Sequence, residues 1–485
     1  MAKKLSYRNL TMRNTKIVAT LGPATDSAEK IRELLEAGVN VFRLNMSHGS
    51  HEEHGQRIRL VRELAAELGI SPGILLDLQG PKIRLGAFEN GGCYLQTGSV
   101  FTLTVEDVTG TAERASVSYP QFAAELGPED RILIADGAVE LKVIDTDGTS
   151  VRSRVVTGGF VGDRKGVNLP GVQVSTPALT KKDRTDLRFG LDAGIDMVAL
   201  SFVRKRDDVL RLRLHLEEQD ASLPIIAKIE KPEAWENIDQ ILDESDGVMV
   251  ARGDLGVELA LEKVPCIQKT IIERARERGK FVITATQMLE SMVNSPVPTR
   301  AEVSDVANAI HDGTDAVMLS AETSTGRYPV EAVRMMARVA VEAETATRSK
   351  GFHKQVALDV TATPSEIVAD AAYRAADVTK PAAIVALTRS GYTARLVARY
   401  RPPVPIYVFT PSENVVRQLA VIYGVRPVLV PKLDSSDEVL LELDELLQEK
   451  GRLKPNDRVI ILAGLPMAKM GPTNVMKLHR VGELR

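Results

Sequence analysis

The sequence predicts an α/β protein: a (β/α)₈ TIM barrel with an inserted all-β lid domain and a C-terminal α/β domain with an open, mostly parallel sheet. Three observations lead to this prediction. Eight apolar runs alternate with helical patterns up to about Ser349. Short β-type runs interrupt the alternation between the third and fourth apolar runs. A second series of alternating strands and helices follows the barrel and predicts a further sheet domain.

The barrel strands are predicted from near-continuous apolar runs, as expected for parallel strands buried on both faces. The expected strands are Lys16–Thr20, Val41–Asn45, Ile74–Gln79, Met197–Phe202, Ile225–Glu230, Val248–Asp254, Phe281–Met288 and Ala316–Glu322. Helical stretches separate most of them, among them Ser27–Ala37, His51–Leu68, Arg206–Gln219 and Pro265–Arg278. Eight β/α alternations place the site at the C-terminal ends of the strands.

The lid is predicted where the helical pattern disappears, from about Gly86 to Gly166. Turn signals at 136–137 and 147–148 separate short β-type runs there. The expected strands are Val100–Val105, Ala115–Tyr119, Arg131–Ile134, Val139–Ile144 and Val151–Val156. This insertion occupies a βα-loop at the face of the barrel that should carry the site, so it is placed to act as a lid.

The C-terminal domain begins after about Ser349, where apolar strands again alternate with helices. The expected strands are Ala383–Thr388, Ile406–Thr410, Pro427–Val430, Val459–Gly464 and Val475–Val481. The predicted division is therefore an N-terminal arm at 1–14, the barrel at 15–85 and 167–349, a β-barrel-like lid at 86–166 and a C-terminal regulatory domain at 350–485.

The composition is that of an ordinary globular protein, with 485 residues, 44% hydrophobic and 26% charged. A net charge of −3 gives no reason to expect a nucleic-acid or membrane partner. No apolar run approaches the roughly 20 residues of a membrane span, and no secretory signal is visible. Cys93 and Cys266 lie far apart without metal-ligand spacing, which indicates reduced thiols and a cytoplasmic location.

Polar residues gather at the C-terminal ends of most predicted barrel strands. They are Arg43, Asn45 and Ser47 after the second strand, Asp77 and Arg84 after the third, Lys228 and Glu230 after the fifth, Asp254 after the sixth, Thr286 and Gln287 after the seventh, and Ser320 and Glu322 after the eighth. Buried polar groups need partners, and these converge on one face. The set therefore predicts a binding or catalytic site.

Lys228, Glu230 and Asp254 are the most informative of these residues. Two carboxylates at the ends of two neighbouring buried strands suit a hard cation such as Mg²⁺. An ammonium beside them can stabilise negative charge that develops in a transition state. A structural ion pair between Lys228 and Glu230 is the alternative, since such pairs also perturb buried groups.

Nine phrases at these positions occur in a distinctive order. They read TKIVATLGPA, VFRLNMSHG, LDLQGPKIRLG, KGVNLPG, KIEK, ARGDLG, ATQMLESM, PTRAEVSDVANA and DGTDAVMLSAET. Together they closely resemble the pyruvate kinase family, from about Thr15 to Ala343. The resemblance continues more loosely to the end, through TRSGYTA and GPTNVMKL.

The resemblance implies transfer of a phosphoryl group from phosphoenolpyruvate to ADP, giving pyruvate and ATP in the last step of glycolysis. It implies a divalent metal, Mg²⁺ with Mn²⁺ as a substitute, and a homotetramer in the cytoplasm. Two other functions stay open at this point. A metal-dependent lyase or aldolase acting on a pyruvate enolate would need neither the lid nor its nucleotide contacts. A non-catalytic metabolite sensor would be favoured by loss of the charged strand-end residues, which are present.

The resemblance also implies roles for individual residues. Glu230 and Asp254 hold the metal, and Lys228 stabilises charge on the phosphoryl group and the enolate. Arg43 binds the substrate phosphate, and the enolate is protonated through a water on Thr286. The substrate carboxylate is received by the backbone amides of Gly253 and Asp254 and the hydroxyl of Thr286.

Nucleotide contacts are implied for Arg84 and Lys165 on the lid side and for Pro23 and His48. Each role has a simpler alternative. Arg43 could pair with a neighbouring carboxylate, Arg84 and Lys165 could be solvated, and His48 could cap a loop.

One position departs from the family pattern. Members that need potassium hold it near residues that correspond to Asn45, Ser47 and Asp77, and the following stretch reads Thr-Lys-Gly-Pro-Glu. In this chain the corresponding stretch, residues 78–82, reads Leu-Gln-Gly-Pro-Lys, so its last residue is Lys82. We expect the Lys82 ammonium to replace the monovalent cation, so that potassium is not required, because a fixed charge nearby does similar Coulomb work. In the alternative, Lys82 points to solvent and potassium still binds.

The C-terminal domain carries the phrase TRSGYT immediately after an apolar strand and before a helix. Backbone N–H groups and hydroxyls at such a turn can bind a phosphate, and the family often uses this loop for a phosphorylated effector. The residues concerned are Thr388, Ser390, Gly391 and Thr393. A plain capped helix start is the alternative.

Overall fold

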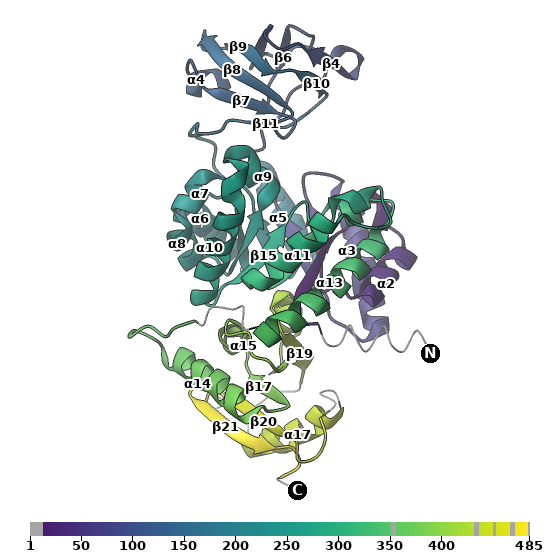
Figure 1. Cartoon of the computed structure of the whole chain (residues 1–485), viewed down its shortest axis with the longest axis vertical. Helices are drawn as coiled ribbons and strands as arrows, with labels where there is room; N and C mark the ends of the chain where they lie inside the picture. The colour runs from purple at the N-terminus through teal and green to yellow at the C-terminus, as the bar shows by residue number, and fades with distance from the viewer. Residues whose placement is uncertain (1–12, 351–355, 431–435, 450–452, 466–470, 484–485) are drawn as a thin grey trace.

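The computed structural model describes residues 13–350, 356–430, 436–449, 453–465 and 471–483. The lid, the barrel and the C-terminal domain follow one another along the long axis of the molecule (Figure 1). The predicted arm lies outside the described residues apart from Arg13 and Asn14, which are buried. No helix among the described residues is long and apolar enough to cross a membrane.

The centre of the molecule is a closed barrel with the strand order β1-β16-β15-β14-β13-β12-β3-β2. All neighbouring pairs are parallel, so the predicted eight-stranded barrel is confirmed. The strands are β1 Lys16–Thr20, β2 Val41–Asn45, β3 Gly73–Asp77, β12 Met197–Leu200, β13 Ile225–Ile229, β14 Gly247–Ala251, β15 Phe281–Ala285 and β16 Ala316–Leu319.

Several barrel strands end earlier than their apolar runs suggest. The expected strand to Asp254 stops at Ala251 because Arg252–Glu258 forms helix α9. The expected strand to Glu322 stops at Leu319 because Ala321–Ser324 forms α12. These expected ends were wrong. The polar residues leave the hydrogen-bonded ladder at the strand end, which frees them to turn into the mouth of the barrel.

Helices surround the barrel and bury their apolar faces on it. They are α2 Ala28–Ala37, α3 His51–Leu68, α5 Lys181–Ala193, α6 Arg206–Glu217, α7 Pro232–Glu236, α8 Ile238–Glu244, α10 Val264–Glu277, α11 Arg300–Asp312 and α13 Pro329–Lys350. Short 3-10 turns are η1 Pro23–Thr25, η3 Leu261–Lys263 and η4 Glu290–Val293. The predicted start of α3 follows from a capping box between Ser50 and Glu53, and Gly69 ends it at φ 63°.

The lid contains a six-stranded sheet with the order β11-β7-β8-β9-β5-β6 and a two-stranded sheet β10-β4. The elements are η2 Glu89–Gly91, β4 Gly92–Leu95, β5 Val100–Thr104, β6 Arg114–Ser116, α4 Phe122–Glu125, β7 Arg131–Ile134, β8 Val139–Thr146, β9 Ser150–Thr157, β10 Gly159–Gly162 and β11 Val167–Asn168. The sequence did not predict β4 and β10, because their glycines give a weak strand signal.

The C-terminal sheet has the order β19-β18-β17-β20-β21, and only β21 runs antiparallel to its neighbour. This confirms the open, mostly parallel sheet. Its elements are α14 Pro364–Thr379, β17 Ala383–Leu387, α15 Tyr392–Ala398, β18 Ile406–Thr410, α16 Glu413–Gln418, η5 Leu419–Val421, β19 Val425–Leu429, α17 Ser436–Glu449, β20 Arg458–Ala463 and β21 Val475–Arg480.

Candidate active site

Lys228 lies at the centre of the charged residues in the barrel mouth. Its Nζ is 2.8 Å from Glu230 Oε1 and 3.3 Å from Asp77 Oδ1, and it donates to Ser201 Oγ over 2.7 Å. Burial alone would lower the pKa of Lys228, but Asp77 and Glu230 outweigh it and the pKa is raised. The ammonium therefore stays charged inside the mouth.

Arg43 shares Asp77 with Lys228. Its Nε donates to Asp77 Oδ2 over 2.7 Å, Nη2 lies 2.7 Å from the same oxygen, and Nη1 donates to Thr20 Oγ1 over 3.0 Å. Burial opposes ionisation of Asp77, but Lys228 and Arg43 outweigh it, so the pKa of Asp77 is lowered. One buried carboxylate thus holds two cations at the C-terminal ends of β2 and β13.

Glu230 and Asp254 bring two carboxylates to the same mouth. Glu230 Oε2 accepts the Phe202 N–H over 3.0 Å. Asp254 lies in the first turn of α9, where burial and the charge of Glu230 raise its pKa to about 6. A divalent cation would relieve this repulsion between two oxygen donors, so the donor set fits a hard metal.

No group of three or more His, Cys, Asp or Glu side chains suited to a metal occurs in the described ranges. Mg²⁺ is commonly held by one or two carboxylates, with water and substrate oxygens as its other ligands. Two protein carboxylates are therefore compatible with Mg²⁺ when a phosphorylated substrate completes the shell.

Gly253 and Thr286 contact each other across neighbouring strand ends. The Gly253 N–H donates to Thr286 Oγ1 over 2.8 Å, and Thr286 Oγ1 donates to the Ala285 carbonyl over 2.6 Å. Thr286 has φ 67° and Gln287 has φ 52°, a conformation that is costly for residues other than glycine and typical of functional sites. Arg252 fixes it by donating to the Thr286 carbonyl over 2.7 Å.

The rim of the mouth carries three further predicted residues. Lys82 is half-buried, and its charge opposes the rise in the pKa of Asp254. The pKa of His48 is lowered by partial desolvation of its ring and then by the charges of Arg84, Lys82 and Arg43. The Lys82 side chain therefore lies within electrostatic reach of the mouth. His48 is exposed on the β2–α3 loop, and Arg84 Nη1 donates to a lid carbonyl over 3.2 Å.

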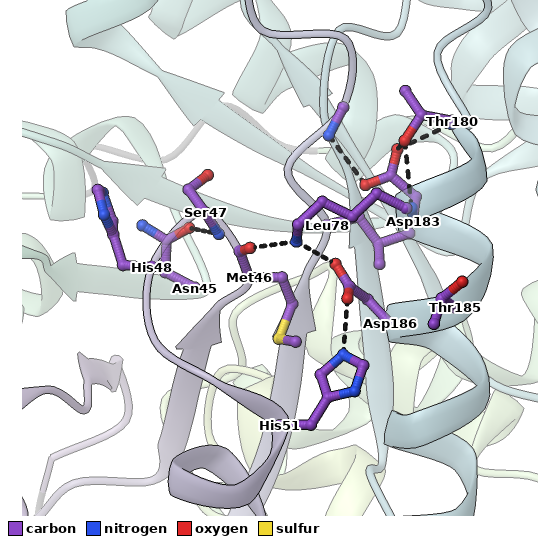
Figure 2. A network of polar contacts seen from close by, with 12 residues as sticks. Asn45, Met46, Ser47, His48, His51, Leu78, Thr180, Asp183, Thr185 and Asp186 are labelled. Atoms are coloured by element: carbon purple, nitrogen blue, oxygen red, sulfur yellow. Dashed lines mark hydrogen bonds and ion pairs between the residues drawn. The ribbon is translucent and has the colours of Figure 1, made fainter. Parts of the chain in front are cut away.

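Residues in the first turns of α5 form hydrogen bonds with the loops that follow β2 and β3 (Figure 2). Lys182 Nζ donates to the Met46 carbonyl over 2.7 Å and to Asp186 over 2.6 Å. Asp183 accepts the Gly80 N–H over 3.1 Å. Asn45 Oδ1 accepts the Ser47 N–H over 3.1 Å, so two of the three residues predicted beside a monovalent cation lie where β2 passes into this anchored loop.

Two predicted nucleotide residues, Lys165 in the lid and Pro23 in η1, are exposed, and their role remains a prediction. In the C-terminal loop, Thr388 Oγ1 accepts the Gly391 N–H over 3.0 Å, and Thr393 Oγ1 lies 2.5 Å from Thr473 Oγ1. The first contact closes the turn before α15, and the N-cap residue of that helix, Gly391, receives no side-chain cap hydrogen bond. The effector role of this loop, including Ser390, remains a prediction.

Thr20 and Ser201, which contact Arg43 and Lys228 respectively, were not predicted as site residues. Both follow the rule used for the other strands, since they end β1 and the run that begins with β12. Asp136 of the lid was not predicted either; its charge makes the last of the contributions to the raised pKa of Asp254. No local signal could have found this effect, because the two residues belong to different domains.

Comparison with known proteins gives one family over nearly the whole chain. The family model "Pyruvate kinase, barrel domain" matches residues 12–333, and "Pyruvate kinase, alpha/beta domain" matches residues 366–479. The chain is 46% identical to a pyruvate kinase of Geobacillus stearothermophilus, over 97% of this chain and 81% of the relative. It is 48% identical to pyruvate kinase 2 of a Synechocystis strain, over 97% and 79%. A crystal structure of a pyruvate kinase from Cryptosporidium parvum superposes with a TM-score of 0.91 at 36% identity, covering 99% of both chains.

Proposed function

The chain belongs to the pyruvate kinase family, and from that premise we propose how its own residues carry out the reaction. It is a phosphotransferase that moves the phosphoryl group of phosphoenolpyruvate to ADP and yields pyruvate and ATP. The family depends on divalent metal. The roles of single residues, the choice of Mg²⁺ and the independence from potassium are our proposals.

The observation that carries the proposal is the charge arrangement around Lys228. Phosphoryl transfer leaves little covalent work for the protein, so positioning and neutralisation of charge dominate. Lys228 stays protonated between Asp77 and Glu230. There it stabilises negative charge on the phosphoryl group and then on the enolate oxygen. Arg43, oriented by Asp77, offers a planar fork of donors to the substrate phosphate.

Glu230 and Asp254 are the carboxylates that would hold Mg²⁺, or Mn²⁺ in its place. The ion supplies Lewis-acid neutralisation of phosphoryl and carboxylate oxygens. The Gly253 and Asp254 amides and the Thr286 hydroxyl bind the substrate carboxylate, which would replace the present Gly253–Thr286 hydrogen bond. When the phosphoryl bond to the enol oxygen breaks and the bond to ADP forms, the enolate carbon takes a proton through a water on Thr286.

Arg84 and Lys165, together with Pro23 and His48, are the proposed nucleotide contacts. Lys82 takes the place of potassium beside Asn45, Ser47 and Asp77. Its partial burial and its effect on the pKa of Asp254 support a position that faces the mouth. A homotetramer in the cytoplasm and a phosphorylated effector at Thr388–Thr393 complete the proposal.

The test is the initial rate of pyruvate formation from phosphoenolpyruvate and ADP with Mg²⁺, with and without potassium. We expect an ADP-dependent rate that potassium does not change. A rate that appears only with potassium would mean that Lys82 points to the solvent and does not replace the ion, and it would leave the enzyme assignment intact. Pyruvate release without ADP would indicate the lyase, and no rate under either condition would indicate the sensor.

A further inference from the structure

The base of the lid is connected to the barrel mouth through a buried cluster of Asn168, Lys231 and Glu258. Asn168 ends β11, the strand by which the chain returns from the lid, and its Nδ2 donates to Glu258 Oε1 over 3.0 Å. Lys231 Nζ donates to the same oxygen over 2.5 Å. The Glu258 side chain is 1% exposed and that of Lys231 is 12% exposed. One carboxylate oxygen therefore joins three separate elements.

Both barrel partners in this cluster are close in the chain to a candidate metal carboxylate. Lys231 follows Glu230 directly at the end of β13. Glu258 is the last residue of α9, and Asp254 lies in the first turn of that helix, which lies directly beneath the lid in Figure 1. A short hydrogen-bonded helix moves as a unit, so a displacement of Glu258 is transmitted to Asp254.

The outgoing connection of the lid reaches the same carboxylates by a second contact. Gly80 packs against the ring of Phe202, since a Cβ at Gly80 would lie 2.7 Å from Phe202 Cδ2. The Phe202 N–H donates to Glu230 Oε2 over 3.0 Å, and its ring centroid lies 5.8 Å from Lys231 Nζ. Both segments that connect the lid to the barrel are thus linked to the candidate metal carboxylates.

The hinge, by which we mean the two segments that connect the lid to the barrel at Pro81 and Asn168, borders a small open cleft. This cleft has a cavity volume of about 40 Å³, and its lining includes Pro81, Val167, Asn168 and Phe202. Close-packed side chains resist displacement, whereas side chains that border empty space can shift without overlap. A shift of the lid base can therefore reach the cluster.

We propose that Asn168 and Glu258 are positioning residues that couple the position of the lid to the geometry of the Glu230–Asp254 pair. The inference rests on the proposed metal site and adds how its two carboxylates are aligned. The coupling is reciprocal: a metal held by the pair biases the lid, and the lid biases the affinity of the pair for the metal.

The experiment measures lid position and metal binding separately in the full chain. Spin labels on Ala124→Cys in the lid and on native Cys266 in α10, with Cys93→Ser, report the lid–barrel distance with and without Mg²⁺; residues 124 and 266 are both exposed. Mn²⁺ binding is followed by the EPR signal of the free ion. If the lid exchanges between a near and a far position, we expect the metal to change the ratio of these two positions in the parent about tenfold, within the usual range of coupling between sites.

Asn168→Ala and the nearly isosteric Asn168→Asp both remove the amide donor to Glu258. We expect both to bind Mn²⁺ within about threefold of the parent while Mg²⁺ no longer shifts the lid, because the link is lost and the carboxylates remain. Tyr119→Phe is the matched control. It removes a hydroxyl that lies 3.2 Å from Ser175 Oγ on the same return connection and that donates to Glu125 within the lid over 2.5 Å.

A lid that still responds to Mg²⁺ in both Asn168 variants, or that never responds in a parent that binds Mn²⁺, overturns the coupling and leaves the proposed function standing. If both Asn168 variants lose Mn²⁺ affinity to the same extent while their lids still respond to Mg²⁺, the coupling is also overturned. Asn168 would then only support the fold of the metal site. A parent that binds no Mn²⁺ instead contradicts the metal assignment itself, and the coupling fails with it.

Discussion

The two ends of the barrel both bury charged side chains, but they do so in opposite ways. At the C-terminal ends of the strands, burial and then the charge of Glu230 raise the pKa of Asp254 to about 6. At the N-terminal ends, Lys16 and Arg13 crowd together, and the pKa of Lys16 falls to about 7, chiefly through burial and then through Arg13. At one end the charged form of a carboxylate is disfavoured, and at the other end the charged form of a lysine is disfavoured.

The difference lies in what covers each end. Lys16 Nζ donates to the Val425 carbonyl of the C-terminal domain over 2.7 Å, and Arg401 of that domain pairs with Asp315 over 2.8 Å. The cations below the barrel are therefore sealed by packing, as expected where this face serves stability. The mouth faces the lid across a hinge. A buried charge alone does not identify a site; a strained group that a ligand can still reach does.

The largest expected effect is at the mouth. Lys228→Met should lower kcat by about 10³-fold, because the charge that develops on the transferred group loses its buried cation. Breaking the buried pairs should also lower the free energy of unfolding by about 3–5 kcal/mol. Steady-state rates and urea unfolding measure the two effects.

The control for Lys228→Met is Lys269→Met, which removes an exposed lysine from α10. It should leave kcat unchanged, because Lys269 pairs with Asp312 between α10 and α11, two helices that surround the barrel. If Lys228→Met keeps a rate within tenfold of the parent, Lys228 is only a structural partner of Glu230, and the contrast between the two ends of the barrel fails.

At the opposite end, Lys16 should affect stability and leave the rate unchanged. Below pH 7 the lysine is charged in both states, so folding then carries the cost of burying the charge. Between pH 7 and 10.5 the unfolded chain holds more protons, so the free energy of unfolding of the parent should rise by about 2–4 kcal/mol with pH. Lys16→Met should abolish that rise. Urea unfolding from pH 6 to 10 measures it, and a parallel slope in the variant would contradict the assignment.

The mouth was largely predictable from sequence and the lower end was not. Arg43, Lys228 and Asp254 each follow an apolar run, and barrel geometry brings such ends together. The partners of Lys16 and Asp315 come from a domain more than 80 residues away in the chain, at Arg401 and beyond. No local pattern encodes such a contact, so tertiary packing decided it.

The boundaries and the pairing inside the mouth were also beyond the sequence. The pattern of polar residues in the sequence does not predict whether Arg43 contacts Asp77, as it does in the structure, or points to the solvent. The left-handed backbone conformation of Thr286 is likewise not predictable from the sequence, because threonine disfavours a positive φ. Sequence reasoning fails where the fold imposes an unfavourable conformation, as at many functional sites.

Asp254→Asn tests the strained anion directly. A carboxyl whose pKa is raised from 3.8 to about 6 contributes stability at low pH that is lost as the pH rises through about 6. Without metal, at pH 8, the Asn variant should therefore be more stable than the parent by about 1–3 kcal/mol. Mg²⁺ should stabilise only the parent. Urea unfolding with EDTA or Mg²⁺ at pH 5 and 8 checks this, and a variant less stable than the parent at pH 8 in EDTA would count against it.

Lys82 gives the smallest expected effect and the sharpest test of why the mouth is charged as it is. Lys82→Glu moves the local charge by two units, so without potassium the rate should fall by at least about tenfold. Potassium should restore it, because under our proposal position 82 faces Asn45, Ser47 and Asp77, and a carboxylate there can attract the ion. Lys82→Met is the matched variant: it loses the cation without adding an acid, so its rate should fall and respond less to potassium. If Lys82→Glu keeps the parental rate and ignores potassium, Lys82 does not supply the missing cation. Among the buried cations of the mouth, Arg43 and Lys228 would then remain to meet the substrate phosphate together with the proposed metal, and both already share Asp77.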